Sequence, residues 1–251
     1  MGTVPSGLKI FVRVAAVAAL SLALSGCFYP LAVHHQNTNP DTRPWWCNSM
    51  GGEGTHGSQY YMDQGIVKGP LSWDDCLEIS AQFDAALEFA QQWPTRGEAE
   101  ADGWNATVNY ATGMGTHHSR GGLGSFNPEQ PTFLQYGGNG PSAKLVGMSW
   151  FVNNGPDAPP EGFAGDNDWW HTHEYLCFVN GMVVYDGTCE EGGISGGNTA
   201  YLGNFWLLHA WIVPGWQHQP DVFIGHHPCL LPGGPAGPDH ECWHGGGHME
   251  H

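Results

Sequence analysis

Residues 205–213 read FWLLHAWIV, and every position in this run except His209 is apolar. An extended segment that is apolar on both faces is typical of a strand buried on both sides. We therefore expect this run to form a buried strand. A buried imidazole has to be hydrogen-bonded or bound to a metal ion, so His209 is predicted to be either a satisfied core residue or a ligand.

Other short apolar runs, rich in β-branched and aromatic residues, follow residue 103 and are separated by Gly, Pro and Asn turns. They cover residues 131–136, 144–153, 174–185, 200–213 and 221–224. This pattern predicts a mainly β protein, built as an antiparallel sheet or barrel.

One packed helix is expected before the strands, over residues 72–93. Its apolar residues recur at helical spacing, Ser72 and Asp75 form a variant of the capping box, and Pro94 ends it. Residues 95–103 are expected to add a short second helix, whereas residues 51–69 are expected to be irregular.

The composition excludes several classes of protein. The 251 residues include 38 Gly, 18 Pro, 12 Trp and 15 His, a content that does not suit a coiled coil. Only 7 Lys and Arg stand against 24 Asp and Glu, for a net charge of −17. Nucleic acid is therefore not expected as a partner, because its phosphates would be repelled.

The N-terminus carries an export signal. Lys9 and Arg13 precede an apolar run over residues 14–24, which is too short to span a membrane. The run ends in Leu-Ser-Gly-Cys27, which resembles the bacterial lipobox. The resemblance implies cleavage before Cys27, a diacylglycerol group on its thiol, and palmitate among the lipid chains. An ordinary signal peptide that contains a Cys is the alternative.

We expect four segments along the chain: a signal peptide over 1–26, a tether over 27–50, a single β-rich domain over 51–231, and a flexible His- and Gly-rich tail over 232–251. Loss of the signal peptide removes two basic residues and no acid, which takes the net charge from −17 to −19. Acyl chains would then have to hold the protein at the extracytoplasmic face of a cell membrane, because an acidic body gains no attraction from anionic head groups.

Six cysteines remain after Cys27, and an even number is typical of disulfides in exported proteins. The favoured pairs are Cys47–Cys76, Cys177–Cys189 and Cys229–Cys242. Metal ligation by these cysteines would require CxxC spacing, which the sequence does not contain.

The strongest site signal is residues 165–174, which read GDNDWWHTHE. His171 and His173 would project from the same face of a strand, so both imidazoles could reach one metal ion. Asp166 and Asp168 are candidates to accept hydrogen bonds from these imidazoles, and Glu174 is a weaker ligand candidate because it would point to the other face. Two surface histidines beside a Trp pair are the alternative.

The spacing from Gly165 through five residues to His171-x-His173 resembles the first motif of cupins. This resemblance implies a cupin-like barrel with a metal-dependent oxidoreductase or hydrolase site. The chain departs from the cupin pattern at Cys177 and Phe178, where a glutamate would stand. The second cupin motif is matched only loosely, by Pro214-Gly215 and His218.

Residues 113–118 read GMGTHH, and adjacent histidines in an extended segment face opposite sides, so at most one of His117 and His118 would join a site. Together with three other motifs, this segment resembles an uncharacterised group of exported bacterial proteins. The matching residues are Met114-Gly115-Thr116-His117, Leu145-Val146-Gly147, Leu208-His209-Ala210-Trp211 and His227-Pro228-Cys229. The resemblance implies that His117, His209 and the His171/His173 pair belong to one feature of the fold.

The C-terminus is rich in histidine and follows His226-His227. His-rich tracts of this kind bind Cu, Ni or Zn, although the same tail could be solvated without any ligand. The candidate tail ligands are His240, His244, His248 and His251.

Taken together, the patterns predict an exported, membrane-anchored protein that holds a divalent transition metal, Cu, Zn or Fe. Its expected ligands are His171 and His173 with His117 or His209. The metal would be either cargo or the cofactor of an enzyme. The Trp content alone would also fit a structural or sugar-binding surface protein. No nucleophile or phosphate-binding motif is present.

Overall fold

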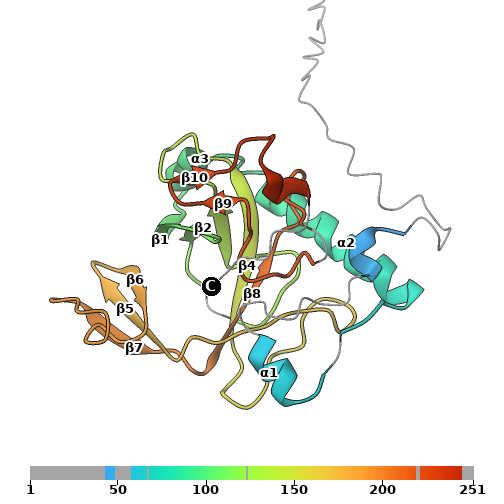
Figure 1. Cartoon of the computed structure of the whole chain (residues 1–251), viewed down its shortest axis with the longest axis horizontal. Helices are drawn as coiled ribbons and strands as arrows, with labels where there is room; N and C mark the ends of the chain where they lie inside the picture. Colours follow the sequence, from blue (N-terminus) through green and yellow to red (C-terminus); the bar gives the residue numbers. More distant parts are fainter. Residues whose placement is uncertain (1–42, 49–57, 67, 123, 219–220, 245–251) are drawn as a thin grey trace, which may run out of the picture. The chain divides into compact units, whose positions relative to one another are not determined.

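Eight strands form one curled sheet in the order β7-β5-β6-β1-β2-β3-β4-β8 (Figure 1). The computed structural model describes residues 43–48, 58–66, 68–122, 124–218 and 221–244. The strands are β1 Asn105–Ala111, β2 Gly115–Ser119, β3 Phe133–Tyr136, β4 Leu145–Asn153, β5 Tyr175–Val179, β6 Met182–Asp186, β7 Asn198–Tyr201 and β8 Phe205–Ala210. A small hairpin follows, with β9 Leu230–Leu231 and β10 Gly234–Pro235. The mainly β fold is therefore confirmed.

The sheet is antiparallel except at one place, where β1 and β6 pair in parallel through Val108 and Val183. The most apolar strands, β4 and β8, lie at one end of the sheet. All residues of β4 from Leu145 to Trp150 are buried, and β4 pairs with β8 over six consecutive residue pairs. Both strands contribute buried apolar side chains to the core. They also carry two buried polar residues, Ser149 on β4 and His209 on β8.

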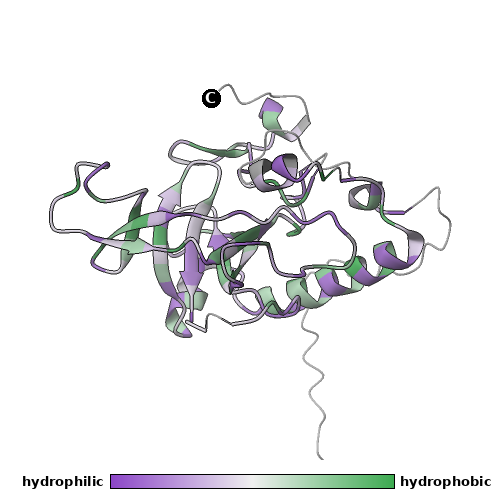
Figure 2. Cartoon of the chain, turned by 90° about the horizontal axis from the view of Figure 1, so that it is seen from below, coloured by the Kyte–Doolittle hydropathy of each residue, from purple (hydrophilic) through white to green (hydrophobic). Residues whose placement is uncertain are grey.

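The main helix is α2, Trp73–Ala90, and two short helices, α1 Ser58–Asp63 and α3 Arg96–Ala101, flank it in the sequence. Ser72 caps α2 by accepting the N–H of Asp75 at 3.1 Å. Figure 2 shows apolar and polar residues alternating along this helix. Its buried side carries Phe83, whose ring contacts Phe163 and Phe223 at centroid distances of 5.1 and 5.7 Å.

Several expected elements differ in the structure. The helix ends at Ala90, and the residues before Pro94 form a turn. Residues 221–224 are buried but do not form a strand, because the Asp221 carboxylate accepts the N–H of Phe223 and turns the chain. The segment expected to be irregular before residue 70 contains α1.

The three expected disulfides are present, with Cα–Cα distances of 5.4 Å for Cys47–Cys76, 4.8 Å for Cys177–Cys189 and 5.4 Å for Cys229–Cys242. All three distances are ordinary for cystine. In the part of the predicted tail that the structure describes, β10 and a 3-10 helix, Glu241–His244, are present, and Cys242 joins this segment to Cys229.

The predicted signal peptide and Cys27 lie outside the described residues. Among the residues that the structure does describe, no helix is long and apolar enough to cross a membrane.

Candidate metal centre

Four imidazoles meet on one face of the sheet. His117 comes from β2, His209 comes from β8, and His171 and His173 come from the segment that precedes β5. The ring centroids are 5.5 Å apart for His117 and His209, 5.2 Å for His209 and His171, and 5.2 Å for His171 and His173. The structure thus brings together the four histidines that the sequence singles out.

The register of the sheet explains how His117 and His209 reach each other. His117 lies opposite Gln135 of β3, and Gln135 lies opposite Gly147 of β4. Two residues further along β4, Ser149 lies opposite His209. Because side chains alternate along a strand, these five residues share a face, and the curl of the sheet turns the two histidines toward each other.

Gly147 leaves room for this approach. A Cβ at this position would lie 2.7 Å from a ring carbon of Trp211 and 2.9 Å from Oε1 of Gln135. Trp211 and Gln135 therefore pack directly over the backbone of β4, and a larger residue would push them away. Gly147 and Trp211 both belong to the short motifs on which the resemblance to exported bacterial proteins rests.

The closest polar contact joins Nε2 of His117 and Nε2 of His209, at 3.3 Å. Nε2 of His117 also lies 3.1 Å from the amide nitrogen of Gln135, which donates to the carbonyl of Met114 as well. An amide nitrogen can only donate, so Nε2 of His117 is an acceptor whose lone pair is directed at the amide of Gln135. Burial lowers the pKa of His117 to about 3, which keeps this imidazole neutral.

The contact between His117 and His209 has the spacing of two imidazoles on one metal ion. With metal–nitrogen bonds of about 2.0–2.1 Å, two imidazoles on a tetrahedral ion have bonded nitrogens about 3.3 Å apart and ring centroids about 5 Å apart. As the side chains stand, no group of three or more His, Cys, Asp or Glu in the described parts of the chain is arranged to hold a metal ion. Ligation of one ion by more than two of these histidines would therefore require their rings to move.

His171 and His173 are held by the backbone and by a carboxylate. The segment expected to be a strand forms only an isolated bridge, in which His171 exchanges two backbone hydrogen bonds with Leu207 of β8. The bridge sets His171 beside His209. Nδ1 of His173 contacts Oδ1 of Asp186 at 2.9 Å. The side chain of His173 is 12% exposed and is the most accessible of the four.

The sequence suggests Asp168 as a hydrogen-bond partner of these imidazoles, but its carboxylate bonds to the backbone of Phe163. Its carboxylate is buried and accepts the N–H of Phe163 at 2.8 Å. Burial raises the pKa of Asp168 to about 8, against the opposing charge of Lys68. Asp186, which was not predicted, supplies the carboxylate contact to His173.

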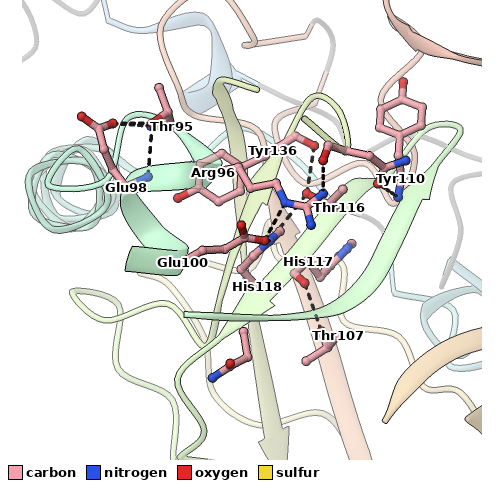
Figure 3. A network of polar contacts seen from close by, with 12 residues as sticks. Thr95, Arg96, Glu98, Glu100, Thr107, Tyr110, Thr116, His117, His118 and Tyr136 are labelled. Carbon is pink, nitrogen blue, oxygen red and sulfur yellow. Dashed lines mark hydrogen bonds and ion pairs between the residues drawn. The ribbon is translucent and has the colours of Figure 1, made fainter. Parts of the chain in front are cut away.

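His118 faces the other side of β2, away from His117, as Figure 3 shows. Its Nε2 lies 3.2 Å from Oε1 of Glu100, which also accepts a hydrogen bond from Arg96 at 2.7 Å. Nδ1 of His118 is 3.4 Å from the hydroxyl of Thr116. Burial lowers the pKa of His118, while the contact with Glu100 opposes that effect.

The C-terminal histidines do not join the cluster on the sheet. Buried His227 is satisfied at both nitrogens: Nε2 donates to the carbonyl of Trp216 at 2.9 Å, and Nδ1 accepts the N–H of Cys229 at 3.1 Å. Nδ1 of exposed His240 accepts the N–H of Cys242. The side chain of His244, together with His248 and His251, lies outside the described part of the chain.

Comparison with protein-family models, curated proteins and solved structures found no match. The cupin-like spacing and the lipobox therefore stay predictions from the sequence. The structure adds three polar residues at the cluster that the sequence analysis missed, Gln135, Ser149 and Asp186. Only the register of the strands reveals them, because none belongs to a metal-binding motif.

Proposed function

We propose that this chain is an exported, lipid-anchored protein that binds one divalent transition metal ion, copper or zinc, through His117, His171, His173 and His209. The observation that supports the proposal is the run of ring contacts that joins the four imidazoles, with neighbouring centroids 5.2–5.5 Å apart. Imidazole is a good ligand for Cu and Zn. The predicted tail ligands would supply further, weaker sites, because a chain has to lose entropy to wrap around an ion.

The surroundings support metal binding over an ordinary buried polar cluster. His117, His171 and His209 are 4%, 3% and 0% exposed, and burial keeps His117 in the neutral form that a metal requires. The contact of Asp186 with His173 is the carboxylate–histidine arrangement that commonly orients metal ligands. The acidic net charge of the chain would also concentrate cations near the site.

The test is the metal content of full-length protein purified without an affinity tag or chelators, followed by competition titration against a chromophoric chelator. We expect one tight equivalent in the wild type and none in His171→Ala/His173→Ala. The matched control is His240→Ala/His244→Ala/His248→Ala/His251→Ala, which leaves the Cys229–Cys242 disulfide intact. It should lose only weak binding. Retention of the tight equivalent by the first variant, with its loss from the tail variant, would assign metal binding to the tail alone.

The anchor is tested separately. The three disulfides support an oxidising compartment outside the cytoplasm. Cys27→Ser should release the protein from the membrane fraction or leave it uncleaved. A processed Cys27→Ser protein that still fractionates with membranes would contradict lipid attachment at this residue.

A further inference from the structure

A pocket of about 470 Å³ lies on the part of the sheet formed by β5, β6 and β7, which stand at one end of the strand order (Figure 1). Its larger side chains are Phe178 on β5, Asn180 in the turn that follows, and Asn198 and Ala200 on β7. This volume is within the range of small-molecule sites. The described residues that line the pocket include none of the four clustered histidines, so it is a separate candidate site.

The strand register fixes the face on which the pocket lies. Phe178 lies directly opposite Asn198 in the antiparallel pairing of β5 with β7, and Ala200 is two residues further along β7. Because side chains alternate along a strand, these three residues share one face. Tyr175 and Tyr201, whose rings are 5.5 Å apart, belong to the opposite face. The pocket is therefore distinct from this exposed tyrosine pair.

Two features of the backbone hold the walls of the pocket in place. Asn180 and Gly181 form the two-residue turn between β5 and β6, with φ of +52° and +80°, which fits the type I′ turn that Asn-Gly prefers. On the other side, the loop before β7 crosses the Cys177–Cys189 disulfide so closely that a Cβ on Gly197 would lie 2.7 Å from Sγ of Cys189. Both walls are thus constrained, which lowers the entropy cost of binding a ligand.

The lining combines an aromatic ring with two carboxamides. Phe178 is half-buried, whereas Asn180 and Asn198 are exposed, so the ring and both amides are accessible to a molecule in the pocket. Each carboxamide offers an acceptor oxygen and two N–H donors. Neighbouring hydroxyl groups of a sugar supply the matching donors and acceptors, and the C–H face of a pyranose ring suits the negative face of an aromatic ring.

The charge of the site favours a neutral ligand. No charged side chain is among the described residues that line the pocket, so it offers no ion pair. The net charge of the chain, −17, also disfavours an acidic ligand. A neutral sugar meets both conditions.

We infer that this pocket binds a neutral pyranose sugar, whose C–H face packs on the Phe178 ring and whose hydroxyls bond to the side chains of Asn180 and Asn198. The inference does not depend on the proposed metal binding. Because both asparagines are exposed, the pocket covers one side of the sugar, and we expect an affinity in the millimolar range. Export of the chain, as proposed above, would place the pocket where cell-surface carbohydrates are found.

The test is NMR titration of the full-length, ¹⁵N-labelled protein with three neutral trisaccharides, cellotriose, maltotriose and chitotriose. With at least one of them, the side-chain amide signals of Asn180 and Asn198 should shift and saturate. Saturation-transfer signals of the bound sugar then compare the variants, and circular dichroism checks that each variant is folded.

Two variants alter the pocket by different means. Phe178→Leu keeps an apolar side chain but removes the ring, and should weaken binding about tenfold. Asn180→Gly/Asn198→Ala removes both carboxamides while keeping a residue that tolerates positive φ in the turn, and should weaken binding by at least about tenfold. The matched control is Tyr201→Ala, which removes a ring that is 53% exposed on the other face of β7 and should bind as the wild type does.

Absence of saturable shifts with all three trisaccharides would overturn the inference. Sugar binding that survives both pocket variants, or that is lost in Tyr201→Ala, would place the sugar on the tyrosine face and overturn the pocket assignment. Because β7 is an edge strand, N-acetyl-trialanine amide is the competing probe. Larger shifts with this peptide than with any sugar, centred on the backbone N–H groups of β7, would assign the pocket to peptides instead.

Discussion

His117 and His118 are neighbours on β2, yet the two faces of the strand give them different surroundings. His118 lies against the carboxylate of Glu100 and the hydroxyl of Thr116, so polar partners of ordinary core type surround it. His117 lies against the imidazole of His209 and the amide of Gln135. A neutral, buried histidine among other histidines is placed as a ligand would be, whereas His118, both of whose ring nitrogens contact protein groups, is placed as a structural residue would be.

The largest expected effect comes from replacing each of these two histidines with alanine and measuring metal affinity. His117→Ala should weaken the tight metal equivalent by about a thousandfold or more, which corresponds to about 4 kcal/mol, because it removes the Nε2 that faces His209. His118→Ala should leave the affinity within a few fold. The measurement is chelator competition on both variants, with circular dichroism as a check of folding. Similar losses in both variants would show that the metal responds to damage of β2 and not to ligation.

A second prediction uses His227 as a histidine that serves only the structure. Burial, with a smaller contribution from His218, lowers the pKa of His227 to about 4. A depressed histidine pKa means that the unfolded chain binds the proton more readily. The stability due to His227 is therefore fully present above pH 6.5 and falls as the pH drops toward 4, by roughly 3 kcal/mol.

This pH dependence is measured by urea unfolding of the metal-free wild type and of His227→Gln across that range. The wild type should lose more stability than the variant on acidification. Parallel curves for the two proteins would contradict the assignment of a lowered pKa to His227.

The sequence predicts well those features that depend on local pattern. The apolar runs mark β4 and β8, the capping residues mark α2, and the alternation of side chains along a strand separates His117 from His118. The cysteine pairs follow from the count and from short Gly- and Pro-rich loops. Except for the cysteine pairs, which are 12 to 29 residues apart, the signal lies within a few residues of the chain.

Features that depend on register and on tertiary pairing were missed. Strand β1 has exposed and half-buried residues without an apolar run, so nothing in its sequence marks it as a strand. Its parallel pairing with β6 joins segments far apart in the chain. Gln135 and Ser149 become part of the cluster only because the registers of β2, β3, β4 and β8 place them opposite histidines.

The third prediction concerns the exposed end of the histidine cluster. Asp186→Asn should weaken metal binding about tenfold, at the lower end for loss of a carboxylate that orients a ligand. Oδ1 of Asp186 contacts Nδ1 of His173, so Nε2 is the nitrogen of His173 that we propose as the metal ligand. Glu174→Gln is the control, since Glu174 is an exposed acid next to His173 in the sequence. A larger loss in Glu174→Gln than in Asp186→Asn would make Glu174 the relevant carboxylate, as the sequence had left open.

The smallest effect is expected on the other face of β2. Glu100→Gln should lower the free energy of unfolding by about 1 kcal/mol, the usual contribution of one hydrogen bond, because Glu100 accepts bonds from Arg96 and contacts His118. These contacts, led by Arg96, hold the pKa of Glu100 below its ordinary value, so its stabilisation is present at neutral pH and is lost as the pH falls through the acid range. Chemical unfolding should therefore show a difference in unfolding free energy between Glu100→Gln and the wild type that is largest at neutral pH and shrinks on acidification. The control is Glu88→Gln, at an exposed position of α2, which should show no difference. Metal affinity should not change in either variant. A loss of metal affinity in Glu100→Gln would mean that the two faces of β2 are coupled. His117 and His118 would then belong to one extended site, and their separate roles would be contradicted.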